Sequence, residues 1–424
     1  MFSTPFIRNL GSMGGAQIAM RVSRLLATIV LTRLLSPNDF GLAAIVLTTH
    51  ELVALFTRNG IAAQVVRAEP NAVAQTAETA YWLSWIACGG LALAQALIAL
   101  PVMWIYDDAR LALPIALMGL VHLATPLCHI QCVMMQREGR LGRIALASGL
   151  QVSADNILTG IFALLGFGMW AIVLPKLLVA PIWVIVTRYG HDWRPASRWW
   201  PTNGLVGWRE ALGFSRHVLA VELMTTVQAN VDNLIVGLTL GVEALGVYYF
   251  AFNAGLGITL GLVNAFGSAI YPHLCQVVGD RVQLAARYRQ ALRTSGLILV
   301  PLVLAQVLLA PIYVPLVFGE KWVVATPVLM LICLSALPRP FANACSQLLK
   351  AIGRPDIEPR WQLALTVLLI AGVFLGSRFG IVGVAVAVLA VQGIVLTLFC
   401  LRAPRPFLRD TTQEWPRSPA TVAV

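Results

Sequence analysis

The segment GIVGVAVAVLAVQGIVLTLFCL (residues 380–401) contains no acidic or basic side chain. A transmembrane α-helix needs about 20 mostly apolar residues to cross the hydrocarbon core, so this segment is long enough to span a bilayer. Similar blocks recur along the 424 residues, of which 58% are hydrophobic and 12% are charged. A soluble domain carries about 25% charged residues. The chain is therefore predicted to be an all-α polytopic membrane protein, because the blocks are too long and too uniformly apolar for β-barrel strands.

About twelve transmembrane helices are expected from the spacing of these blocks. The predicted spans are residues 12–33, 40–58, 78–103, 111–136, 144–166, 168–187, 213–238, 244–274, 291–312, 323–349, 361–377 and 380–401. The split between the fifth and sixth spans rests only on Gly166-Phe167-Gly168.

The distribution of basic residues predicts the orientation of the chain. Its net charge is +11, with 30 Lys and Arg residues. With the N-terminus inside, the outward loops carry only Arg33, Arg110, Lys321 and Arg378. The basic residues within spans are Arg21, Arg24, Lys176 and Arg339. All the others fall on the inward side, which is the bias of cytoplasmic loops, so both termini are expected in the cytoplasm. No nucleic-acid partner is expected, because no soluble domain remains to carry one.

The two halves of the chain resemble each other. LTRLLSPNDFG (residues 31–41) is similar to VGLTLGVEALG (residues 236–246), and Gly139-Arg140 aligns with Gly353-Arg354. The second alignment also places Pro126 on Pro340 as a shared proline within a span, which either loosens the helix for bending or is merely tolerated there.

This similarity predicts two six-helix pseudo-repeat bundles around a central cavity, related by an axis along the membrane normal. The expected domains are an N-terminal bundle over residues 1–190 and a C-terminal bundle over residues 213–402. An interfacial cytoplasmic linker over residues 191–212, rich in Trp and Arg, joins them. Residues 403–424 are expected to form a cytoplasmic tail.

Basic side chains within spans are the candidates for binding an anionic substrate. An ionisable group at the centre of a span costs about 2.5–3.5 kcal/mol on insertion scales, so each one requires a reason. The candidate substrate-binding residues are Gln17, Arg21, Arg24, Lys176 and Arg339. A guanidinium can bind phosphate oxygens bidentately. Two other interpretations stay open: a structural salt-bridge cluster of Arg21 and Arg24 with Glu51 and His50 that closes a gate, and long side chains that reach an interface.

Carboxylates within spans are the candidates for coupling to H⁺ or Na⁺, because protonation could release them from a cationic partner. They are Glu51, Asp155, Glu222 and Asp232; a structural role is equally compatible with Asp232. His122, His129 and His217 could titrate near neutrality, but a single histidine in a helix is more often an ordinary hydrogen-bonding residue. No cofactor is expected. No metal site is expected either, because Cys128, His129 and Cys132 lack a second pair of ligands.

Several motifs resemble one known family. TRLLSPNDFG (residues 32–41) resembles the first-loop signature of Wzx-type polysaccharide flippases. These belong to the polysaccharide transporter family of the multidrug/oligosaccharidyl-lipid/polysaccharide exporter superfamily. NVDNLIVG (residues 230–237) and LGVY (residues 245–248) are similar to the matching segment of the second half. SAIYP (residues 268–272) and QLLKAIGRPD (residues 347–356) resemble later segments, and Leu238 stands where many relatives carry arginine.

The resemblance implies a transporter in the bacterial inner membrane. It would move undecaprenyl-pyrophosphate-linked oligosaccharide from the cytoplasmic to the periplasmic leaflet by alternating access, for exopolysaccharide or lipopolysaccharide biosynthesis. The implied partners are the lipid-linked oligosaccharide, membrane lipids, a polysaccharide polymerase and glycosyltransferases.

Three alternatives to this function stay open. A lipid II-type flippase and a cation-coupled multidrug exporter share the superfamily. The basic excess near span centres disfavours a cavity for cationic drugs. A membrane glycosyltransferase or polymerase is disfavoured, because the sequence has no large outward loop, no Gly-x-Ser-x-Gly and no phosphate-binding loop. The chain is therefore not expected to be an enzyme.

Overall fold

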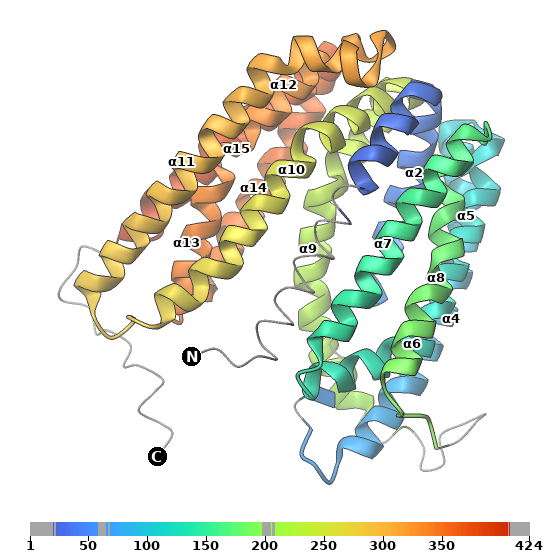
Figure 1. Ribbon diagram of the computed structural model, residues 1–424, viewed down its shortest axis with the longest axis vertical. Helices are drawn as coiled ribbons and strands as arrows, with labels where there is room; N and C mark the ends of the chain where they lie inside the picture. The colour runs from blue at the N-terminus through green and yellow to red at the C-terminus, as the bar shows by residue number, and fades with distance from the viewer. Residues whose placement is uncertain are drawn as a thin grey trace. The chain divides into compact units, whose positions relative to one another are not determined.

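All the regular structure described for this chain is helical. The computed structural model describes residue 20, residues 23–57, 65–66 and 68–196, residue 205, residues 208–405 and residue 407. Over these residues every regular element is an α-, 3₁₀- or π-helix (Figure 1). The all-α prediction is confirmed. The described residues of each expected span are mostly helical.

The chain divides into two compact units, Met1–Asn230 and Val231–Val424. The division falls inside α9 (Trp208–Leu240), so this helix contributes its first part to one unit and its last part to the other. The sequence instead places a linker at residues 191–212, and those domain limits stay a prediction.

In the described part of the first unit, residues 23–34 form a helix. The unit then contains α2 (Pro37–Ala54), η1 (Leu55–Thr57), α4 (Val73–Tyr106), η2 (Ala109–Leu111), α5 (Ala112–Met118), α6 (Leu120–Arg137), α7 (Leu141–Leu164) and α8 (Trp170–Gly190). The helices α7 and α8 pack along each other, as do α4 and α6.

The second unit contains α10 (Val242–Cys275), α11 (Arg281–Tyr313), η3 (Val314–Phe318), η4 (Glu320–Ala325), α12 (Thr326–Ser335), α13 (Arg339–Ala351), η5 (Pro355–Ile357), α14 (Glu358–Gly376), η6 (Ser377–Phe379) and α15 (Gly380–Arg402). The helices α14 and α15 form a closely packed hairpin, and α10 packs on α12 and α13.

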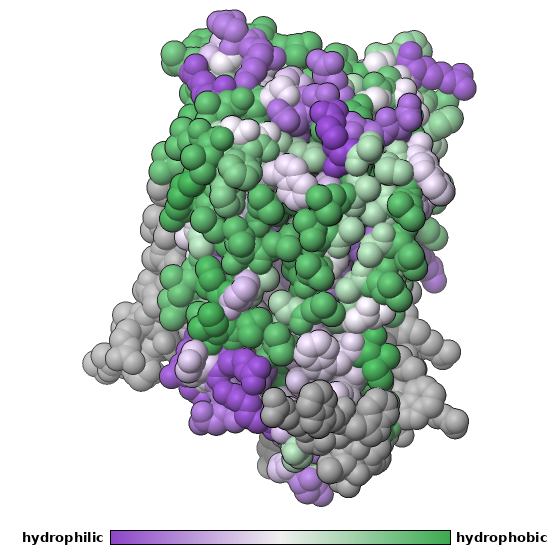
Figure 2. Space-filling view, turned by 90° about the vertical axis from the view of Figure 1, so that its right-hand side faces the viewer, coloured by the Kyte–Doolittle hydropathy of each residue, from purple (hydrophilic) through white to green (hydrophobic). Residues whose placement is uncertain are grey.

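Many of these helices can cross a membrane. By length and composition the described residues contain seven such helical runs, or eight if Val242–Gly257 and Thr259–Cys275, bent by 43°, are one span. The run Pro355–Arg402 has 48 residues and contains the hairpin of α14 and α15. At 1.5 Å per residue its two helices together amount to about 70 Å, twice the hydrocarbon thickness, so the hairpin accounts for two crossings. On the face drawn in Figure 2, hydrophobic residues cover the middle and hydrophilic residues gather toward the ends. The chain is a membrane protein.

The family motif at residues 32–41 forms a helix cap. Ser36 precedes α2, and its hydroxyl accepts a hydrogen bond from the backbone N–H of Asp39 at 3.2 Å. The carboxylate of Asp39 accepts in return from the backbone N–H of Ser36 at 3.0 Å. Pro37 at the first helical position has the φ that a helix start requires. A Cβ at Gly168 would lie 2.9 Å from Oδ1 of Asp39, so this glycine allows the α7–α8 turn to approach the cap.

The aligned pairs Gly139-Arg140 and Gly353-Arg354 form the same kind of turn. After α6, the N–H of Gly139 donates to the carbonyl of Gln136 at 3.1 Å, and the N–H of Arg140 donates to that of Met135 at 2.8 Å. After α13, Gly353 and Arg354 donate to the equivalent carbonyls of Lys350 and Leu349 at the same two distances. Both glycines have positive φ, 69° and 73°. The two turns are the same Schellman cap, which glycine adopts without strain. Gly166 ends α7 with the same pair of hydrogen bonds, so the cap by itself does not test the alignment of the two halves, which stays a prediction.

The two aligned prolines differ in their surroundings. Pro126 lies inside α6, which continues past it, whereas Pro340 lies in the first turn of α13 just after the break that separates α13 from α12. In the first unit the corresponding break lies earlier, at Gly119 between α5 and α6. A shared role of the two prolines in bending stays a prediction.

Candidate functional site

A buried carboxylate lies next to the first residue of the second unit. Asp232, on α9, is 4% exposed. Its Oδ2 accepts a hydrogen bond from the hydroxyl of Tyr248 at 2.7 Å, and its Oδ1 accepts from the backbone N–H of Asn233 at 2.9 Å. Tyr248, on α10, is fully buried. Hydrogen bonds to an ionised acceptor are about twice as strong as neutral ones, so these donors hold the carboxylate in place.

A guanidinium lies close enough for its charge to act on this carboxylate. Arg339 begins α13 and is partly buried. Its Nε and Nη2 donate to the amide oxygen of Gln392, on α15, at 3.2 and 3.0 Å. These bonds orient the planar group and leave Nη1 with donors that an anion could accept. The structure thus brings together a predicted substrate ligand, Arg339, and a predicted coupling residue, Asp232.

The first unit holds an ion pair within its helices. Nζ of Lys176, on α8, lies 3.0 Å from Oδ2 of Asp155, on α7. The two side chains are 35% and 19% exposed, and Oδ1 of Asp155 is buried without a hydrogen bond from any described residue. Next to Asp155 on α7, the amide of Asn156 donates to the hydroxyl of Ser23 at 3.1 Å. The pair thus joins a predicted substrate ligand, Lys176, to a predicted coupling residue, Asp155.

The remaining predicted residues are not brought into one cluster. Glu51, on α2, is exposed and accepts from the amide of Asn230, on α9, at 3.2 Å. Arg24 is exposed, and among the described residues it forms no ion pair with Glu51. Glu222 lies partly buried on α9. Arg21 and Gln17 lie outside the described residues. The assignment of these residues to substrate binding or coupling stays a prediction.

Sequence reasoning missed the polar partners of these ionisable groups. Gln392 stands in an apolar segment, whereas Asn230 and Tyr248 belong to the motifs at residues 230–237 and 245–248 that resemble the known family. An amide within an apolar span is a detectable signal, because it must find a hydrogen-bonding partner in hydrocarbon. The sequence does not show which ionisable group each amide contacts.

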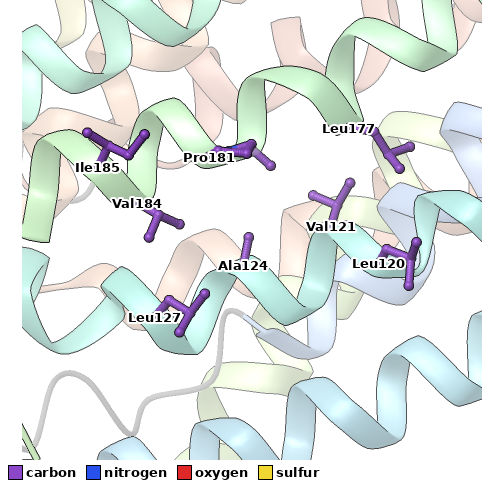
Figure 3. A pocket seen from close by; sticks show the side chains of 9 residues that line it. Leu120, Val121, Ala124, Leu127, Leu177, Pro181, Val184 and Ile185 are labelled. Atoms are coloured by element: carbon purple, nitrogen blue, oxygen red, sulfur yellow. The ribbon is translucent and has the colours of Figure 1, made fainter.

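An apolar groove lies between α6 and α8 (Figure 3). Its volume is about 250 Å³. Leu120, Val121, Ala124 and Leu127 line it from α6, while Leu177, Ala180, Pro181, Val184 and Ile185 line it from α8. None of these side chains is polar, so the groove offers nothing to recognise a charged headgroup.

Comparison with known proteins places the chain in a family. The family model described as "Polysaccharide biosynthesis protein" matches residues 30–327, which include the cap motif and the segment around Asp232. A similar curated protein is the lipopolysaccharide biosynthesis protein WzxC of Escherichia coli K12, 26% identical over 385 residues, covering 88% of this chain and 76% of WzxC. Another is the succinoglycan biosynthesis transport protein ExoT of Rhizobium meliloti, 22% identical over 83% of this chain and 70% of ExoT.

Solved structures of membrane transporters share the fold. The lipid II flippase MurJ in an inward closed conformation aligns with a TM-score of 0.76 at 13% identity, over 92% of this chain and 86% of that chain. An inward-facing multidrug resistance transporter of the MATE family aligns with a TM-score of 0.71 at 17% identity, over 93% and 96%. The resemblance drawn from residues 32–41 and 230–248 is confirmed. The chain belongs to the polysaccharide biosynthesis protein family and has the fold of the multidrug/oligosaccharidyl-lipid/polysaccharide exporter superfamily.

Proposed function

We propose that this chain is a flippase of the bacterial inner membrane. It moves undecaprenyl-pyrophosphate-linked oligosaccharide from the cytoplasmic to the periplasmic leaflet by alternating access of two bundles around a central cavity. A polysaccharide polymerase and glycosyltransferases act beside it, and both termini lie in the cytoplasm. The family membership and the transport role named for ExoT support this class of function.

The observation that carries the proposal is the guanidinium of Arg339 within an apolar unit. A guanidinium within a membrane-spanning run is costly to insert. The orientation of this group by Gln392 leaves donors for a further acceptor. A pyrophosphate offers several anionic oxygens and would supply that acceptor. Lys176 provides a second cation within the helices, already neutralised by Asp155. Both are suited to shield an anionic headgroup while its lipid tail stays in the bilayer.

The buried carboxylates supply the coupling step of the proposal. Asp232 and Asp155 each lie beside a cation that the headgroup would engage. Protonation of either carboxylate would remove its attraction for that cation and would change the relative stability of the two transport states.

Complementation of a flippase-deficient strain tests the proposal. We expect Arg339→Gln and Arg24→Gln each to reduce surface polysaccharide at least tenfold (about 1.4 kcal/mol), with the protein still inserted in the membrane. The matched control is Arg378→Gln, which removes an exposed arginine of η6 and should complement fully. Full activity of Arg339→Gln would remove this residue from the substrate site.

The nearest alternative is a lipid II flippase, which the fold similarity to MurJ favours. Lipid II carries the same carrier phosphate, so charge alone does not distinguish the two substrates. Complementation of a strain depleted of its lipid II flippase separates them. Growth of that strain, without restored surface polysaccharide in the first strain, would support lipid II as the substrate.

A further inference from the structure

Three polar side chains from three helices meet inside the first unit. His50 lies on α2, Gln95 on α4 and His122 on α6. The amide oxygen of Gln95 lies 3.1 Å from Nδ1 of His50 and 2.8 Å from Nε2 of His122. Gln95 is fully buried, His122 is 2% exposed and His50 is partly buried. One amide oxygen therefore contacts both imidazoles.

The orientation of the Gln95 amide is fixed by the backbone of α5. Its Nε2 donates to the carbonyl of Ile115 at 2.9 Å. This carbonyl has lost its usual helical partner, because the helix breaks after Met118 and the N–H of Gly119 donates to Ala116 instead. The amide nitrogen must therefore point toward Ile115, and the oxygen must point toward the histidines.

This orientation decides the tautomer of both rings. An amide oxygen only accepts hydrogen bonds, so Nδ1 of His50 and Nε2 of His122 must both carry a proton. An additional proton can then bind only at Nε2 of His50 or Nδ1 of His122, and it breaks neither hydrogen bond to Gln95. The two rings are stacked, with centroids 4.8 Å apart and planes inclined by 19°. Two positive rings at this separation repel strongly in a low dielectric, so the arrangement accepts one proton and resists a second.

We propose that His50 and His122, held by Gln95, form a one-proton binding site. The helices α4, α5 and α6 bring no Asp, Glu, Lys or Arg within two turns of the pair. The neighbouring charges are Glu51, which follows His50 on α2, and Lys176 on α8, which acts on His50 and is paired with Asp155 on α7.

These neighbours connect the proton site to the substrate, a step that rests on the proposed function. The ammonium of Lys176 repels a protonated His50. A pyrophosphate that approaches Lys176 would offset this repulsion, so the anion and the proton would each strengthen the binding of the other. A charged imidazole also costs more in dry surroundings than in water, so the proton favours a conformation in which the pair is hydrated.

Nitrogen-15 NMR of the intact protein in liposomes tests the site, because the chain has only six histidines. At about pH 8 we expect His50 protonated at Nδ1 and His122 protonated at Nε2. Acidification to about pH 4, below the range in which an exposed histidine titrates, should remove one unprotonated ring nitrogen from the pair and leave the other, because burial and the charge of Lys176 both disfavour a charged ring. The variants His50→Gln and His122→Gln assign the signals. The control is His191→Gln, whose imidazole is hydrogen-bonded to the loop residue Glu138 at 2.9 Å. Both rings neutral throughout, both charged together, or the opposite tautomers would overturn the proposal.

Transport measured over the same pH range tests the connection to the substrate separately. We expect His50→Gln to lose the pH dependence of flipping in proteoliposomes, while His191→Gln keeps it. If no lipid-linked oligosaccharide moves, the proposed function fails, but the NMR result still decides whether the proton site exists. If transport occurs with an unchanged pH profile in His50→Gln, the proton site is not coupled to it.

Discussion

Replacing Tyr248 with phenylalanine removes the hydroxyl that donates to Asp232 at 2.7 Å and leaves the packing of the ring unchanged. Both residues are buried, so water cannot replace the lost donor. A hydrogen bond to a charged group contributes about 1.5–3 kcal/mol. We therefore expect Tyr248→Phe to lower the free energy of unfolding by about 2 kcal/mol. Equilibrium unfolding in mixed micelles, followed by tryptophan fluorescence, measures this change.

Two comparisons make this prediction specific. Tyr189 is 84% exposed, so Tyr189→Phe should change stability by less than about 0.5 kcal/mol. In the Asp232→Ala background the hydroxyl has lost its acceptor, and Tyr248→Phe should then cost at least about 1 kcal/mol less than in the wild type. Equal costs of Tyr248→Phe in the two backgrounds, or a cost no larger than that of Tyr189→Phe, would refute the reasoning.

Three further predictions concern helix ends and a loop carboxylate. Ser36→Ala removes the cap of α2 and should cost about 1 kcal/mol, read as a lower melting temperature; an unchanged value would contradict the role of the cap. Gly353→Ala places a side chain at φ 73° with nothing within 4 Å and should cost about 1 kcal/mol, whereas Gly279→Ala, where the space is equally open, should cost less. The hydrogen bond from His191 lowers the pKa of Glu138. The stability that this carboxylate contributes is therefore present above its unfolded pKa of about 4.3 and is lost as the pH falls through its lower folded pKa. Glu138→Gln should reduce the acid sensitivity of the melting temperature, and an identical pH profile would argue against this contribution.

The spans were predictable from the sequence, because hydropathy alone determines which segments can enter a bilayer. Residues 380–401 and α15 differ by one residue at the C-terminal end. The Gly166-Phe167-Gly168 split was also correct, since two positive φ values produce the turn between α7 and α8. Gly139 and Gly353, which the sequence aligns, form the same kind of cap, because a Schellman cap depends on local sequence.

The partners of the ionisable residues were not predictable in the same way. Depth along the membrane normal follows from counting residues, and it suggested that Arg24 and Glu51 could meet. Depth does not fix the rotation of a helix about its own axis, and Glu51 contacts Asn230 instead. Arg339 and Gln392 are 53 residues apart in sequence, and only the packing of their helices brings them together.

Purified protein reconstituted in liposomes tests the central claim most directly. A membrane-impermeant glycosidase can report the movement of undecaprenyl-pyrophosphate oligosaccharide between leaflets. We predict faster movement than in protein-free liposomes, and a loss of at least tenfold (about 1.4 kcal/mol) in Arg339→Gln. Folded wild-type protein that moves this lipid no faster than protein-free liposomes would contradict the account.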